Sequence, residues 1–116
     1  MNSKMMRQGD ILILEVDNVP KEATKVKPKD KFVIAWGEAT GHFHGLEEVE
    51  KIEAFDTADE AIKFIRTIEP TTLLHGTGGG QNADHAPIKL DGGKTYKFLR
   101  QRQYDWHTQR ESLVND

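Results

Sequence analysis

The chain has 116 residues, of which 36% are hydrophobic and 30% are charged, so we expect a single domain over residues 1–116 with a modest core. The formal net charge of -3 argues against a protein that coats nucleic acid or an anionic membrane through bulk charge. Cysteine is absent, which excludes a disulfide framework, a thiolate metal site and a cysteine nucleophile. Neither a signal peptide core nor an apolar run of membrane-spanning length occurs, so we expect a cytoplasmic protein.

Two extended segments are expected in the first half of the chain. Residues 11–16, with the sequence ILILEV, follow a Gly-Asp turn signal and are typical of a strand buried on both faces. Residues 31–46 begin with an apolar run and are then punctuated by Gly37, Gly41 and Gly45, which indicates bulges or tight bends rather than a helix.

Residues 46–70 fit two different structures. Thr57 and Glu60 have the spacing of a capping box, and the apolar residues that follow fit a short helix near residues 57–68. The same segment also alternates in polarity, as residues 49–55 do, and DTADEA at 56–61 resembles a turn. We expect two strands joined by that turn, with the helix as the alternative.

The remaining segments also predict strands. TTLLH, residues 71–75, reads as an apolar strand, and a glycine-rich loop at 76–84 separates it from the next strand. An apolar strand, the turn residues at 91–93 and an alternating strand then predict a β-hairpin. Seven or so short strands with frequent turns predict a small all-β fold, an antiparallel barrel or sandwich.

Four of the five histidines form a candidate metal site. Residues i and i+2 of a strand face the same side, so His42 and His44 are expected to project together. The other two, His75 and His85, lie at strand ends on either side of the glycine-rich loop and can approach the same face.

Such a set of histidines suits a divalent transition metal, namely zinc, nickel, manganese or iron, and an open coordination position would allow a bound water to be activated. Glu38 and Glu47 are candidate catalytic bases near the site. The competing interpretation is that these histidines only form hydrogen bonds within the fold.

Residues 94–106 interleave aromatic and basic side chains. Arg100, Arg102 and Tyr104 are candidate residues for binding a small anionic ligand, and they share a strand face with Tyr96 and Phe98. Such a face is also able to stack the bases of single-stranded nucleic acid. The competing interpretation, favoured by the acidic net charge, places the two aromatic rings in the core and the arginines at the rim, paired with carboxylates.

Four sequence blocks carry a resemblance to a known family. In chain order they are RQGD (7–10), GEATGHFH (37–44), HAPI (85–88) and RQRQY (100–104), and together they resemble small uncharacterised proteins of bacteria and phages. The resemblance spans most of the chain and implies that residues 37–44, 85–88 and 100–104 act as one unit, without an established activity. The His-x-His segment followed by Glu47 also resembles, more weakly, the first motif of cupins.

The leading hypothesis is therefore a metal or anionic-ligand site, with metal-assisted hydrolysis or cupin-like chemistry if the protein is an enzyme. One alternative is a non-catalytic interaction or structural module of phage or mobile-element origin. Another is single-stranded nucleic-acid binding, which the acidic net charge disfavours. An exposed edge strand in so short a chain makes a homodimer plausible, and no membrane partner is expected.

Overall fold

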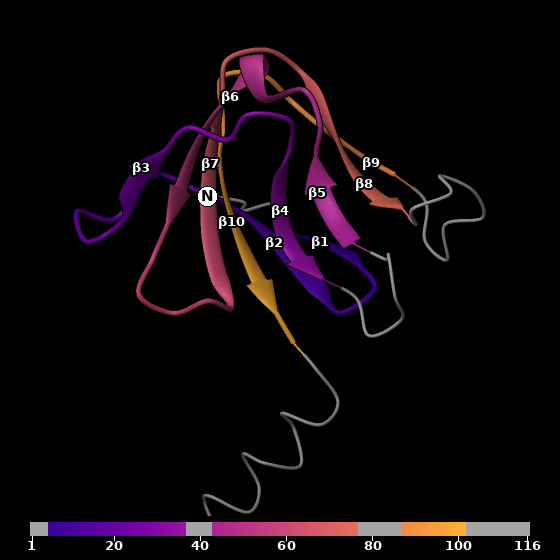
Figure 1. The fold of residues 1–116 in the computed structure, drawn as a ribbon, viewed down its shortest axis with the longest axis horizontal. Helices are drawn as coiled ribbons and strands as arrows, with labels where there is room; N and C mark the ends of the chain where they lie inside the picture. The colour runs from indigo at the N-terminus through magenta and orange to yellow at the C-terminus, as the bar shows by residue number, and fades with distance from the viewer. Residues whose placement is uncertain (1–4, 37–42, 77–86, 102–116) are drawn as a thin grey trace, which may run out of the picture.

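The computed structural model describes residues 5–36, 43–76 and 87–101, and these residues form two antiparallel β-sheets (Figure 1). One turn of 3-10 helix, η1, covers Val49–Lys51. The strands are β1 (Met5–Gln8), β2 (Ile11–Val16), β3 (Thr24–Val26), β4 (Phe32–Trp36), β5 (Phe43–Leu46), β6 (Ile52–Asp56), β7 (Ile62–Thr67), β8 (Thr71–Gly76), β9 (Ile88–Leu90) and β10 (Thr95–Arg100). None of the described helices is long and apolar enough to span a membrane.

The two sheets pack as a sandwich around one apolar core. The larger sheet has the strand order β1-β2-β10-β7-β6-β3, and the smaller has the order β4-β5-β8-β9. In β2, the buried residues Ile11 and Ile13 alternate with half-buried ones, as expected of a strand that turns one face to the core. The all-β fold predicted from the sequence is confirmed, and the core contains Ile11, Ile13, Phe32, Ile34, Leu46, Ile65, Leu73, Leu90, Tyr96 and Phe98.

The ambiguous segment at 46–70 forms the two expected strands, β6 and β7, which pair in antiparallel fashion. The helix considered near 57–68 is not found. The hydroxyl of Thr57 donates to the carbonyl oxygen of Ile62 at 2.9 Å, and Asp59 Oδ1 accepts from the backbone N–H of Ala61 at 2.9 Å. These side chains therefore close a turn between strands, because short polar side chains compete with helical hydrogen bonding.

Residues 31–46 form a hairpin of β4 and β5, which pair in antiparallel fashion with a register shift between Val33 and Ala35. Gly45 is required by close packing, because a Cβ atom there would lie 2.8 Å from the carbonyl oxygen of Phe32. Two short strands, β1 and β3, are additions that the sequence patterns did not predict.

The predicted hairpin around residues 91–93 is wrong, although both of its strands exist. β9 pairs with β8 in the smaller sheet, whereas β10 pairs with β2 and β7 in the larger sheet. The turn between them therefore carries the chain from one sheet to the other.

The crossing turn is held by Thr67, at the end of β7. The Thr67 hydroxyl donates to the Asp91 carbonyl oxygen at 2.6 Å and accepts from the Lys94 backbone N–H at 3.0 Å. Gly93 adopts the left-handed conformation, with φ at 73°, which glycine tolerates without steric cost. The turn is thus bonded to a third strand instead of closing a two-stranded hairpin.

Thr67→Val tests this role, because the substitution keeps the side-chain shape and removes both hydrogen bonds. Thr67 is buried, so the unsatisfied Lys94 N–H and Asp91 carbonyl should cost about 1–3 kcal/mol in the free energy of unfolding. Urea denaturation measures this loss. Thr72→Val is the matched control on β8, and a loss of equal size in the control would contradict the assigned role.

Candidate functional site

A buried glutamine connects the two sheets. Gln8, the last residue of β1, is 1% exposed. Its side-chain Nε2 donates to the backbone carbonyl oxygen of Leu73 in β8 at 3.1 Å, and its Oε1 lies 2.9 Å from Nδ1 of His44 in β5. A buried amide is stable only when such partners replace water, so Gln8 holds β1 against β5 and β8 of the smaller sheet.

The contacts of Gln8 determine which nitrogen of His44 carries a proton. The Leu73 carbonyl can only accept, so the amide nitrogen of Gln8 must face it and Oε1 must face the imidazole. Because Oε1 also accepts only, Nδ1 of His44 is the donor. The other nitrogen, Nε2, lies 3.4 Å from Oδ1 of Asp10, and the His44 side chain is 4% exposed.

A tight turn brings Gln8 and Asp10 to the same imidazole. Gln8 pairs with Ile11 in the β1–β2 ladder, which leaves Gly9 and Asp10 as a two-residue turn. Gly9 has φ at 59°, in the left-handed region that such turns favour and that glycine adopts readily. The block RQGD therefore supplies contacts to both ring nitrogens of His44.

Arg100 extends this chain of contacts from Asp10 to β4. Its Nε lies 3.3 Å from Asp10 Oδ2, and one Nη2 hydrogen bond goes to the backbone carbonyl oxygen of Trp36. Tyr96 and Phe98, four and two residues earlier, are fully enclosed in the core. The interpretation that places these rings in the core and Arg100 at the rim beside a carboxylate is confirmed, and neither ring is available to stack on a base.

Of the other predicted site residues, the structure describes two, His75 and Glu47. His75 is the register partner of His44 across β5 and β8, whereas Glu47 is exposed just beyond the far end of β5. The remaining candidates lie outside the described residues: Glu38, His42, His85, Arg102 and Tyr104. Among the residues that the structure does describe, no group of three or more His, Asp or Glu side chains is placed to hold a metal ion.

Sequence patterns alone did not identify Gln8 and Asp10 as parts of the site. The RQGD block was visible, but its Gly-Asp pair indicates only a turn, and no local pattern marks a glutamine as buried. Their contacts with His44 depend on pairing between strands that are more than thirty residues apart in the sequence.

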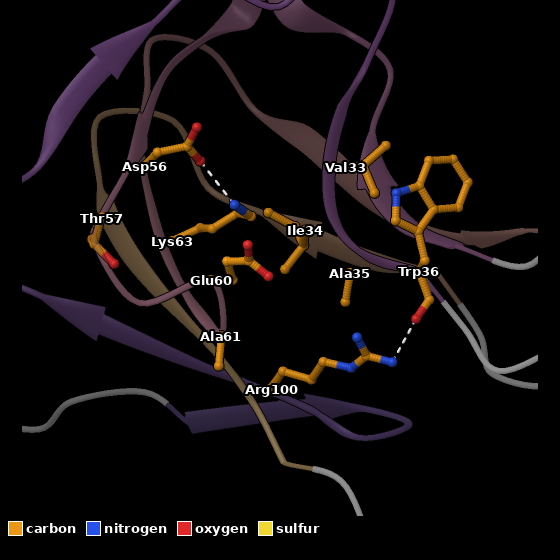
Figure 2. A pocket seen from close by; sticks show the side chains of 10 residues that line it. All are labelled: Val33, Ile34, Ala35, Trp36, Asp56, Thr57, Glu60, Ala61, Lys63 and Arg100. Carbon is orange, nitrogen blue, oxygen red and sulfur yellow. Dashed lines mark hydrogen bonds and ion pairs between the residues drawn. The ribbon is translucent and has the colours of Figure 1, made fainter.

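A pocket of about 390 Å³ lies between edge strand β4, the β6–β7 turn and the end of β10 (Figure 2). Its charged lining combines two cations, Lys63 and Arg100, with two carboxylates, Asp56 and Glu60. Lys63 Nζ donates to Asp56 Oδ1 at 2.8 Å. The apolar wall comes from β4, which contributes Val33, Ile34, Ala35 and Trp36.

Ion pairs and burial shift the pKa values of several groups for simple local reasons. Hydrogen bonds from Arg66 and Lys25 lower the pKa of the Glu53 carboxyl, and bonds from Lys51 and Thr71 lower the pKa of Glu48. Burial raises the pKa of the Tyr96 hydroxyl. These groups belong to surface ion pairs and to the core, where such shifts have structural causes.

Comparison with known proteins matches residues 7–101 to the family model described as Domain of unknown function (DUF8820). The chain belongs to the DUF8820 family. This membership confirms the expected family of uncharacterised proteins, and the matched region contains Gln8, Asp10, His44 and Arg100. Neither the curated proteins nor the solved structures gave a significant match.

Gln8→Met tests whether the buried amide stabilises the contact between the sheets. Methionine has a similar length but cannot bond to Leu73 or His44, so the free energy of unfolding should fall by about 1–3 kcal/mol. Urea denaturation measures the change. Gln101→Met, at an exposed position, should stay within about 0.5 kcal/mol of the unmodified protein. A similar small effect at Gln8 would contradict a structural role for its amide.

Proposed function

We propose that the protein binds a divalent metal ion through His44 Nε2 and Asp10 Oδ1. The observation that carries this proposal is the 3.4 Å separation of these two atoms. Two ligand atoms at about 2.1 Å from a tetrahedral ion lie about 3.4 Å from each other, so the pair already has the spacing of one edge of such a site.

The partner of His44 Nδ1 supports the same conclusion. Histidines that bind metals usually donate their second ring N–H to a fixed acceptor, which orients the ring and sets its tautomer. Gln8 Oε1 is such an acceptor at 2.9 Å, and Gln8 is itself held by Leu73. The metal-binding nitrogen is then Nε2, the atom that faces Asp10.

Histidines are the best candidates for the remaining ligands. His75 is directly opposite His44 in the ladder of β5 and β8, and positions paired in this way are neighbours on the sheet. His42 and His85 stay candidates from the sequence pattern. Imidazole and carboxylate donors without thiolate suit zinc, nickel, manganese or iron.

The chemistry of such a site depends on how many coordination positions of the metal ion are filled by protein ligands. Three protein ligands would leave one position for a water molecule, as metal-assisted hydrolysis or a cupin-like reaction requires. Glu38 and Glu47 remain candidate bases for that chemistry. Four protein ligands would instead favour a purely structural ion.

A non-catalytic structural module is the second candidate function. It is favoured by the contact between Asp10 Oδ2 and Arg100, which gives the carboxylate a role without any metal. In this case the His44–Asp10 pair only links the β1–β2 turn to the smaller sheet, and the family's role would lie in an interaction with another molecule.

Metal content and metal-dependent stability distinguish the two functions. Protein purified without a histidine tag and treated with chelator should take up about one equivalent of zinc, nickel, manganese or iron(II). Metal at one hundred times its Kd should then raise the free energy of unfolding by about 2.7 kcal/mol. Elemental analysis and thermal unfolding measure these two quantities.

His44→Gln and Asp10→Asn should each abolish the metal-dependent part of the stability, whereas Asp17→Asn, at an exposed acid just after β2, should retain it. The structural function predicts that both site variants lose stability equally with and without chelator. Uptake below about a tenth of an equivalent for all four metals would refute the metal site.

A further inference from the structure

The pocket between β4 and the β6–β7 turn has features of a binding site that the metal proposal does not use. It lies between edge strand β4 and the turn from Asp56 to Ala61, and its volume of about 390 Å³ suits a small molecule. Arg100 enters it from the end of β10 (Figure 2).

Arg100 is held so that part of its guanidinium remains available to a ligand. Its Nε faces Asp10 Oδ2, and Nη2 donates to the Trp36 carbonyl oxygen. A guanidinium has five N–H donors, so these contacts do not exhaust it. Figure 2 shows Nη1 turned toward the interior of the pocket. Because the group is fixed from two sides, it can bind an anion without losing much side-chain freedom.

Glu60 supplies the complementary charge. Its carboxylate is turned into the same open space as Arg100 Nη1 (Figure 2). Within the described residues Glu60 has no hydrogen bond or ion pair, in contrast to Asp56, whose Oδ1 is bound by Lys63 at 2.8 Å. The pocket therefore contains the Glu60 carboxylate, which has no partner among the described residues, and the Arg100 guanidinium, which still has N–H groups to donate.

The balance of charges decides the class of ligand. The lining has two cations and two carboxylates, so a multiply charged anion such as phosphate would be repelled by Glu60 as it approached Arg100. A molecule that carries both a carboxylate and an ammonium group matches both side chains. The wall formed by Ile34 and Ala35 suits an apolar substituent on that molecule.

We propose that this pocket binds a small zwitterion, an α-amino acid with an apolar side chain. Arg100 Nη1 binds its carboxylate, Glu60 binds its ammonium group, and β4 contacts its side chain. The site is separate from the metal proposal, because none of its three contacts requires an ion at His44 and Asp10.

Titration of the ¹⁵N-labelled, chelator-treated protein with L-leucine tests this proposal in the absence of metal. We expect saturable shifts of the Ala35, Trp36 and Ala61 amide signals, with a Kd of about 1 mM or lower. Two analogues each lack one charge: 4-methylpentanoate lacks the ammonium group and 3-methylbutylamine lacks the carboxylate. Each should bind about tenfold or more weakly than L-leucine, as should inorganic phosphate.

Substitutions assign the two contacts. Glu60→Gln should weaken L-leucine binding about tenfold and leave 4-methylpentanoate binding unchanged, and Arg100→Lys should weaken both about tenfold. Glu60 is exposed and unbonded within the described residues, so its variant keeps the fold even if Arg100 variants do not. The controls Glu50→Gln and Arg66→Gln, outside the pocket, should change nothing.

Three results would overturn the proposal. These are no saturable shift with L-leucine up to about 10 mM, equal affinity for L-leucine and 4-methylpentanoate, and undiminished L-leucine binding to Glu60→Gln. Because the titration is carried out without metal, failure here leaves the metal proposal standing, and failure of metal uptake leaves this pocket unaffected.

Discussion

The side-chain amide of Gln8 is the contact on which the arrangement of the site depends. Burial between the sheets requires both ends of the amide to find partners, and these are the Leu73 carbonyl and His44 Nδ1. That requirement sets the orientation of Gln8, the orientation of Gln8 makes Nδ1 the donor of the His44 ring, and the position of the ring leaves Nε2 facing Asp10. A single satisfied amide thus determines the chemistry of an imidazole on the opposite sheet.

Asp10 connects the two proposed sites through its two oxygens. Oδ1 faces His44 Nε2, and Oδ2 faces Arg100 Nε, while the other end of Arg100 reaches the pocket. The two-residue turn at Gly9 and Asp10 makes this possible, because it places a carboxylate next to the last residue of β1. Asp10 therefore supports both proposed sites, but the atoms that would bind the metal differ from those that would bind the amino acid.

Local patterns were sufficient for much of the fold. The polarity alternation of residues 62–67 and the polar turn before them predict strands, and β7 is found there because its hydrogen bonds and its inward face are both local properties. The sheet to which a strand belongs is not a local property. The segment at 91–93 has the composition of a hairpin turn, but its bonding partner is Thr67 on another strand, and the chain crosses between sheets.

The same distinction applies to the site. Residue type and strand parity single out His44 and Arg100, and the structure places both in one chain of contacts. The sequence did not identify Gln8 and Asp10, because their roles depend on burial and on partners in other strands. Glu47, three residues after His44, is exposed just beyond the end of β5, and its role as a base stays a prediction.

The most direct test of this account is the protonation of the His44 ring, measured by long-range ¹H–¹⁵N correlation in the metal-free protein and again after zinc is added. We predict a proton on Nδ1 in both states, and a shift confined mainly to the Nε2 signal when zinc binds. A neutral ring with its proton on Nε2 and none on Nδ1 would contradict the role assigned to Gln8, and unchanged ring signals in zinc would contradict the metal site.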